Sequence, residues 1–259
     1  MKGLIIRDLY CLKKSIKLLL AVTAGVVLLA VLFVISTRHG NIASGVVSMR
    51  AEDPEAAEQM FGMFEVGIWV TLAVPLAFIA NVTDCFKEDH RADFQKFLFT
   101  MPVKYSAVVG SRYITCLLFA LVSYVGSMLA AFFVSLASDT YQFSELAAIV
   151  SVVAAIFVVY AALVLLLMYI MGSSRADLVQ IIPFVAIGVV VYAIFVRKML
   201  SMDDAQLDAM MANFGGMLDK AKDTMMNYGV VSLFGALLIL GLSYLLSVYV
   251  MNHKKGRKL

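Results

Sequence analysis

The chain has 259 residues, of which 62% are hydrophobic and only 15% are charged, and its mean hydropathy is +0.92. A soluble fold of this composition would leave much apolar surface in water, so the sequence excludes a soluble globular protein and predicts an integral membrane protein. The net charge of +3 excludes little by itself, because a membrane divides the charged residues into two populations.

Residues 1–17 predict a short basic amphipathic helix at the inner membrane surface. Ile5, Leu9, Leu12 and Ile16 recur at helical spacing, and basic residues lie between them. Such a helix lies in the headgroup layer with its apolar face toward the acyl chains. The alternative is a simple positive anchor that sets the topology.

Six long apolar segments predict an all-α polytopic membrane protein with six transmembrane helices. A helix needs about 20 residues to cross roughly 30 Å of hydrocarbon. The segments cover residues 18–36, 66–83, 107–137, 146–171, 178–196 and 228–251. We therefore expect one transmembrane domain over residues 1–259, with no room for a separate soluble catalytic or ATP-binding domain.

The charged residues between these segments predict the topology. Fifteen basic residues fall at the N-terminus, in the second loop up to Arg112, at Arg175 and in the C-terminal tail, whereas six fall on the opposite side among twelve acidic residues. By the positive-inside rule, both termini and the loop over residues 84–104 are cytoplasmic, and residues 197–227 are extracellular.

The cytoplasmic loop after the second span predicts a second amphipathic helix. An apolar stripe follows helical spacing, a charged face accompanies it, and Pro102 ends the helix. The stripe consists of His90, Phe94, Phe97, Leu98 and Met101, and the charged face of Lys87, Glu88, Arg91 and Gln95. Such a helix can lie on lipid, dock into a groove of a soluble partner, or remain a solvated loop helix.

Small and hydroxyl-bearing residues mark the third and fourth spans. Ser123 and Ser127 belong to a stripe that repeats every four residues, a pattern that lets helices approach closely in lipid. Tyr124 and Tyr160 fall near the bilayer midplane. These four residues are candidates for lining a cavity, and interhelical hydrogen bonding explains them equally well.

The extracellular segment over residues 197–227 is acidic and rich in methionine, and Gly215-Gly216 predicts its division into two short amphipathic helices. Thioethers can bind Cu(I), but no histidine or cysteine accompanies them. Methionine readily fills apolar faces, which is the favoured interpretation, and we expect no metal site.

Several kinds of chemistry have no counterpart in the sequence. The patterns G-x-x-x-x-G-K-[ST], H-E-x-x-H and G-x-S-x-G are all absent, so the sequence favours a non-catalytic membrane subunit without a bound cofactor or nucleic acid. No ionisable residue falls near the middle of a predicted span, which argues against proton- or sodium-coupled transport. Any transport energy would come from another subunit.

Two stretches carry a resemblance to a known family. They are MKGLIIRDL with LKKS at residues 1–9 and 12–15, and FLFTMPVK at residues 97–104 with the later Ser111-Arg112-Tyr113. The chain resembles the permease subunit of an ABC transporter of the type-2 (exporter) class, in its small six-span bacterial branch. The resemblance implies an elbow helix at residues 1–17 and a coupling helix within residues 84–101.

The resemblance also implies partners and a role. The coupling helix would dock on a separate cytoplasmic ATP-binding subunit, and two such subunits would serve two permeases, identical or sibling, in a bacterial plasma membrane. The coupling residues would be Glu88, Asp89, Arg91, Phe94, Phe97 and Met101. Family members of this kind are associated with export of amphipathic peptides, antimicrobials or lipid-like compounds, and residues 197–227 would partly re-enter the outer leaflet.

Three alternatives remain open. A substrate-binding membrane component of a vitamin-uptake system also has about six spans, and here only serine and tyrosine would line its pocket. A membrane sensor or an immunity protein would need no ATPase. An intramembrane enzyme is the least supported, because no nucleophile–base or metal constellation is present.

Overall fold

The computed structural model describes residues 2–38, 54–92, 94, 104–137, 142–172, 175–200 and 214–256. Nearly all of these residues are helical, and no strand occurs among them. The elements are α1 (Lys2–Cys11), α2 (Lys13–Arg38), α4 (Pro54–Ala77), the 3-10 helix η1 (Phe78–Thr83), α5 (Asp84–Arg91), α7 (Tyr105–Ala137), α8 (Phe143–Met171), α9 (Ala176–Leu200) and α11 (Phe214–Gly256).

Five stretches are long and apolar enough to cross a membrane: Lys13–Phe33, Glu65–Arg91, Tyr105–Leu136, Phe143–Met171 and Lys220–His253. Within α9, the described apolar stretch Ala176–Ala186 is too short to meet this criterion. The prediction of an all-α polytopic membrane protein is therefore confirmed. The count of six spans stays a prediction.

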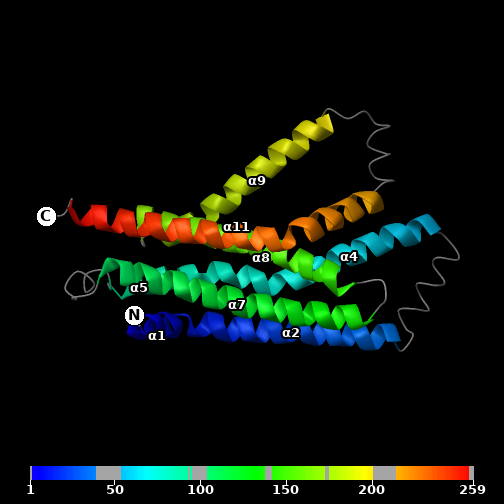
Figure 1. The fold of residues 1–259 in the computed structure, drawn as a ribbon, viewed down its shortest axis with the longest axis horizontal. Helices are drawn as coiled ribbons and strands as arrows, with labels where there is room; N and C mark the ends of the chain where they lie inside the picture. The colour runs from blue at the N-terminus through cyan, green and yellow to red at the C-terminus, as the bar shows by residue number, and fades with distance from the viewer. Residues whose placement is uncertain are drawn as a thin grey trace.

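The long helices α2, α4, α7, α8 and α11 run side by side (Figure 1). The N-terminus, the C-terminus and α5 lie at one end of this bundle, as the charge pattern predicts, whereas α9 diverges from it toward the other end (Figure 1). α8 is the most buried of the long helices, and it packs most extensively against α11.

The predicted helix over residues 1–17 is divided into two. α1 ends at Cys11, Leu12 forms a turn, and α2 begins at Lys13. Backbone bonds continue across the turn, because the Leu12 amide donates to the Asp8 carbonyl at 3.0 Å and the Ile16 amide to the Leu12 carbonyl at 2.8 Å. The fully buried Leu12 packs with Leu19, Cys85 and Phe119, so this part of the predicted stripe faces protein rather than lipid.

The second span changes helix type near its end. Pro75 lies inside α4, where it removes one backbone donor to the preceding turn, and from Phe78 the chain continues as the 3-10 helix η1. α5 then begins at Asp84 as predicted but ends at Arg91, where Ala92 adopts φ −86° and ψ 3°. A helix within residues 84–101 is therefore present, but its described part ends at Arg91, and Phe97, Leu98 and Met101 of the predicted stripe lie outside the described residues.

Gly215 and Gly216 lie at the start of α11, and the segment before them that was predicted to form another helix, residues 201–213, lies outside the described residues. Both glycines lie in the first turn of α11, whose opening amides have no intrahelical partners, so glycine disturbs little there. The 43 residues of α11 extend about 65 Å, well beyond the roughly 30 Å hydrocarbon layer. Re-entry of residues 197–227 stays a prediction, because most of that segment lies outside the described residues.

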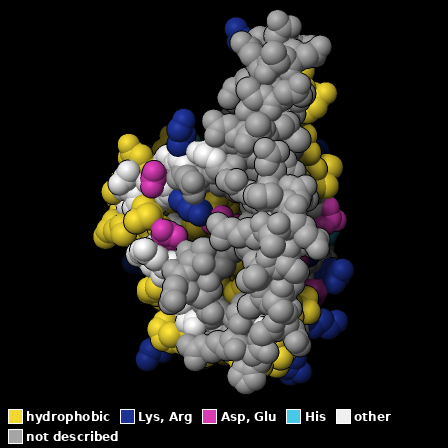
Figure 2. Space-filling model, turned by 90° about the vertical axis from the view of Figure 1, so that its right-hand side faces the viewer, with side chains coloured by type: hydrophobic (Ala, Val, Ile, Leu, Met, Phe, Trp, Pro, Cys, Tyr) yellow, Lys and Arg dark blue, Asp and Glu magenta, His cyan; other side chains and the backbone are white. Residues whose placement is uncertain are grey.

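An ion pair joins the extended parts of α4 and α11. Lys222 Nζ lies 2.6 Å from Glu65 Oε1, and both side chains are largely buried. Figure 2 views this end of the molecule, where acidic and basic side chains lie close together among hydrophobic ones. The pair fixes two helices where they extend toward the predicted outer side.

Close packing between α2 and α7 depends on Gly126. A Cβ atom at this position would overlap the Cγ2 methyl of Thr23, and the Thr23 hydroxyl has no hydrogen-bond partner in the described part of the chain. The neighbouring small residues Ser127, Ala130 and Ala131 are fully buried. The small-residue stripe therefore serves helix packing, as its spacing predicts.

We predict that Gly126→Ala destabilises the protein by about 1–3 kcal/mol, because the added methyl overpacks the α2–α7 contact. Thermal unfolding in mild detergent measures the effect. Gly25→Ala is the matched control, since a Cβ there meets no atom within 4 Å, and Thr23→Ala combined with Gly126→Ala should recover stability. Equal melting temperatures for the Gly126→Ala and Gly25→Ala variants would contradict the packing described.

Candidate functional site

A buried cluster of two arginines and two aspartates joins three elements at the end of the bundle that holds the termini. Arg112 comes from the second turn of α7 and is 1% exposed, and Asp8 comes from α1 and is 0% exposed. Asp89 of α5 and Arg7 of α1 complete the cluster. We refer to these four residues as the buried ion cluster.

Every charge in the buried ion cluster has an opposite partner. Arg112 Nη1 lies 3.3 Å from Asp8 Oδ1, and Arg112 Nη2 pairs with Asp89 Oδ2. Arg7 Nη2 lies 2.8 Å from Asp8 Oδ1 and 3.3 Å from Asp89 Oδ1. The Ser111 hydroxyl donates to Asp8 Oδ2 at 2.8 Å. Two positive and two negative groups thus compensate one another without leaving a net charge in the apolar interior.

Aromatic rings enclose the two guanidinium groups. Arg112 Cζ lies 5.1 Å from the centroid of Phe86, which packs edge-on against Tyr169 of α8. Arg7 Cζ lies 3.7 Å from the centroid of Phe94. Cations over ring faces gain electrostatic stabilisation, more when water is excluded. The rings therefore stabilise the two guanidinium groups.

The free-energy cost of separating buried charges makes this cluster a rigid connection between α1, α5 and α7. Burying an ion costs several kcal/mol, which only well-placed partners offset, and removing one partner of a buried pair costs about 3–5 kcal/mol. α1, α5 and α7 can separate only if Asp8, Asp89 or Arg112 loses its partner. The cluster therefore holds these three elements together as one unit.

A second polar group connects α5 and η1 to α9. Lys87 Nζ lies 2.8 Å from Asp177 Oδ1 and donates to Gln180 Oε1 at 3.2 Å. Gln180 Nε2 in turn donates to the Thr83 hydroxyl, and the Tyr160 hydroxyl of α8 donates to the Gln180 carbonyl at 2.7 Å. We call Thr83, Lys87, Tyr160, Asp177 and Gln180 the α9 latch.

The charged part of the α9 latch is exposed, unlike the buried ion cluster. The Asp177 side chain is 84% exposed. Hydrogen bonding and the positive charge of Lys87 lower the pKa of the Asp177 carboxyl from its usual value. Solvent screens an exposed pair of this kind, so this attachment is much weaker than the buried ion cluster.

One face of α5 remains open to solvent. Glu88 Oε1 and Arg91 Nη1 pair at 2.7 Å, both side chains are exposed, and His90 is exposed beside them. The exposed pair contributes little to stability. α5 is thus held through Asp89 and Lys87 and presents a charged surface elsewhere.

A model of a known family, described as ABC-2 family transporter protein, matches residues 59–252, about three quarters of the chain. The chain belongs to the ABC-2 transporter family. It is accordingly the membrane permease component of an ABC transporter. No curated protein and no solved structure matches the chain.

The structure divides the coupling residues predicted for this permease into three groups. Glu88 and Arg91 lie on the exposed face of α5. Asp89 and Phe94 face the protein instead, where Asp89 pairs with Arg112 and the Phe94 ring contacts Arg7. Phe97 and Met101 lie outside the described residues. Contact with an ATPase stays a prediction for the exposed pair, whereas Asp89 serves the internal joint.

Three of the four residues considered as cavity lining form interhelical hydrogen bonds in the permease. Ser127 donates to the Leu72 carbonyl at 2.8 Å, the Tyr124 and Ser151 hydroxyls lie 3.0 Å apart, and Tyr160 belongs to the α9 latch. Ser123 is fully buried, and its hydroxyl has no partner among the described residues. The alternative explanation from helix packing therefore accounts for these three contacts.

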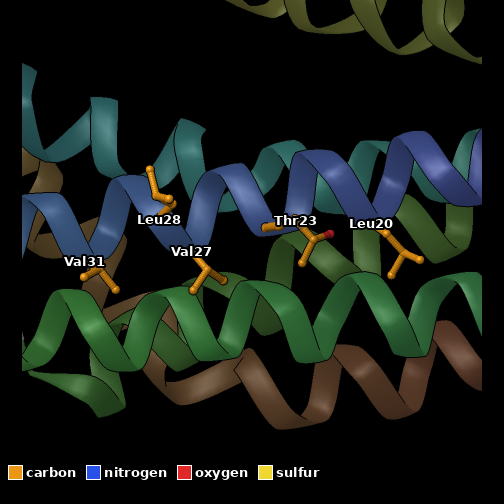
Figure 3. A pocket seen from close by; sticks show the side chains of 6 residues that line it. Leu20, Thr23, Val27, Leu28 and Val31 are labelled. Atoms are coloured by element: carbon orange, nitrogen blue, oxygen red, sulfur yellow. The ribbon is translucent and has the colours of Figure 1, made fainter.

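An apolar groove of about 520 Å³ lies along α2 instead (Figure 3). It is open rather than enclosed, and α2 alone supplies the residues that line it, Leu20, Thr23, Ala24, Val27, Leu28 and Val31. None of the predicted cavity residues lines it. The groove offers one hydroxyl and otherwise hydrocarbon, which suits lipid contact.

Asp8 and Arg112 cannot be recognised as a pair from the sequence alone. Asp8 is the first acidic residue of the chain and the only one before Glu52, on a segment otherwise rich in lysine. Arg112 lies in the second turn of a long apolar helix. Each residue is unusual in its own helix, an acid in one and a base in the other. They lie about a hundred residues apart, however, so the sequence does not reveal that they meet.

We predict that Arg112→Met destabilises the permease by about 3–5 kcal/mol, because Asp8 then loses one of two partners in a buried setting. Unfolding in mixed micelles measures the loss. Adding Asp8→Asn should recover part of it, since Arg7 and Asp89 then form a balanced pair. Arg91→Gln, which breaks an exposed pair, should stay within about 1 kcal/mol of the parent. Similar losses for Arg112→Met and Arg91→Gln would contradict the account.

Proposed function

We propose that this permease is the membrane subunit of an ATP-driven exporter and that α5 receives the motion of a separate cytoplasmic ATP-binding subunit. The observation that carries the proposal is the dual attachment of α5. Its exposed face carries Glu88 and Arg91, while its inner face is joined through Asp89 to α1 and α7. A short helix held in this way can transmit a force from a soluble partner into the bundle.

The direction of transmission follows from the strengths of the attachments. A force on α5 acts first on α1 and α7, because the buried ion cluster resists separation. α7 runs the length of the bundle and packs against α2, α4, α8 and α11. Through α7, a displacement of α5 would therefore move most of the helices of the permease. This transmission does not require a charged residue near the middle of a span.

The remaining parts of the proposal concern the assembly. Two ATP-binding subunits would serve two permeases, identical or sibling, with both termini and α5 on the cytoplasmic side of a bacterial plasma membrane. The placement of both termini and α5 at one end of the bundle supports this topology (Figure 1). The excess of basic residues in the same segments supports it as well. The proposed substrate class is an amphipathic peptide, antimicrobial or lipid-like compound.

The test is copurification of the full-length, tagged permease from gently solubilised native membranes, followed by mass spectrometry. We predict a near-stoichiometric ATPase that carries a P-loop. The double variant Glu88→Arg with Arg91→Glu keeps the ion pair within α5 but inverts the charges shown to a partner. It should reduce ATPase recovery about tenfold, which corresponds to about 1.4 kcal/mol of binding free energy.

Asp223→Lys is the matched control, because this exposed residue lies on α11 near the opposite end of the bundle. It should leave ATPase recovery unchanged. Recovery of the parent protein without an ATPase in several mild detergents would contradict the proposal. Equal ATPase recovery with the double variant would contradict the assignment of the α5 surface.

A further inference from the structure

α9 packs against the rest of the permease near its N-terminal end. Its main neighbours are α8 and η1. Ala176, Val179 and Pro183 are buried near its start, whereas every described side chain from Phe184 to Ala193 is exposed, including Phe184 at 74%. Figure 1 shows the helix diverging from the bundle beyond its first turns. The orientation of α9 therefore depends on contacts made in its first two turns.

The polar contacts in those turns converge on two residues of α9. Asp177 accepts from Lys87, and the Gln180 side chain lies between Lys87 and Thr83. The Gln180 carbonyl accepts from Tyr160 of α8. Lys87 is the only member of the α9 latch that comes from α5, so it is the latch residue that connects the proposed ATPase-facing helix to α9.

We infer that Lys87 is a positioning residue that sets the angle of α9 and releases it when α5 moves. This inference rests on the proposed function for the source of the movement, but the link between Lys87 and α9 does not depend on an ATPase. α5 is fixed on one side by the buried ion cluster and on another by an exposed pair to Asp177. When α5 is displaced, the exposed pair gives way first, since water replaces its partners at little cost.

Lys87 lies close to two acidic side chains, Asp84 and Asp177. Asp84 Oδ1 lies 3.8 Å from Lys87 Nζ, farther than Asp177 Oδ1 at 2.8 Å, and Asp84 Oδ2 accepts from Ser15 of α2 at 2.9 Å. Lys87 therefore has a second acidic neighbour on its own helix. After release from Asp177, Lys87 remains compensated by Asp84, so α9 can detach without leaving an isolated cation at the membrane surface.

The test measures the position of α9 in the full-length permease alone, reconstituted in lipid nanodiscs. Spin labels on cysteines at Ile156 of α8 and Tyr192 of α9, both exposed, report their separation by pulsed electron paramagnetic resonance. Cys11 is replaced by serine, and Cys85 and Cys116 are buried from the label. We expect one main distance in the parent, and a broadened or second distance in Lys87→Met and in Asp177→Asn.

Two further variants distinguish a change in the position of α9 from a general loss of stability. Lys87→Arg keeps the positive charge beside Asp84 and Asp177 and should keep the single distance, whereas Arg91→Gln breaks an α5 pair that does not involve α9 and should leave the distance unchanged. If the distance distribution of Lys87→Met superimposes on that of the parent, the inference is overturned. Because no ATPase is present, failure of this test leaves the proposed ATPase docking intact, and failure of copurification leaves the role of Lys87 intact.

Discussion

The structure depends on the pairing of a buried arginine with two aspartates from distant parts of the chain. Arg112 remains charged in any biological condition, and its burial in the second turn of α7 is tolerable only if anions accompany it. Asp8 and Asp89 supply that charge from α1 and α5. The requirement fixes where the N-terminal helix and the loop helix sit on the bundle, because neither can move away without depriving the buried Arg112 of a paired carboxylate.

This constraint gives α1 a second role besides contact with the membrane surface. Asp8 faces inward and is fully buried, whereas Ile6 and Tyr10 are exposed on the opposite side. One face of the helix therefore joins the ion cluster and another is free to contact lipid. α5 combines the same two properties, since Asp89 faces inward and Glu88 and Arg91 face outward. At this end of the bundle, α1 and α5 are therefore joined by buried ion pairs and carry exposed charged side chains.

Much of the fold could be predicted from the sequence, because hydropathy and span length alone predict a polytopic helical bundle. The break at Leu12 could not, since Leu12 is buried by tertiary contacts with Leu19, Cys85 and Phe119 that the apolar spacing does not reveal. The sequence also predicted that Asp89 faces a partner, whereas the structure turns it inward. The direction in which Asp89 faces depends on Arg112 and Arg7, which are distant in sequence.

The distance between α1 and α5 in the complex of permease and ATPase shows whether the buried ion cluster moves as one unit. Labels at Lys2 and His90, both exposed, report it with and without bound nucleotide. The account predicts one narrow distance that nucleotide does not change, because the buried ion cluster moves as a unit. A distance that changes with nucleotide would show that α5 moves independently of α1, and would contradict the account.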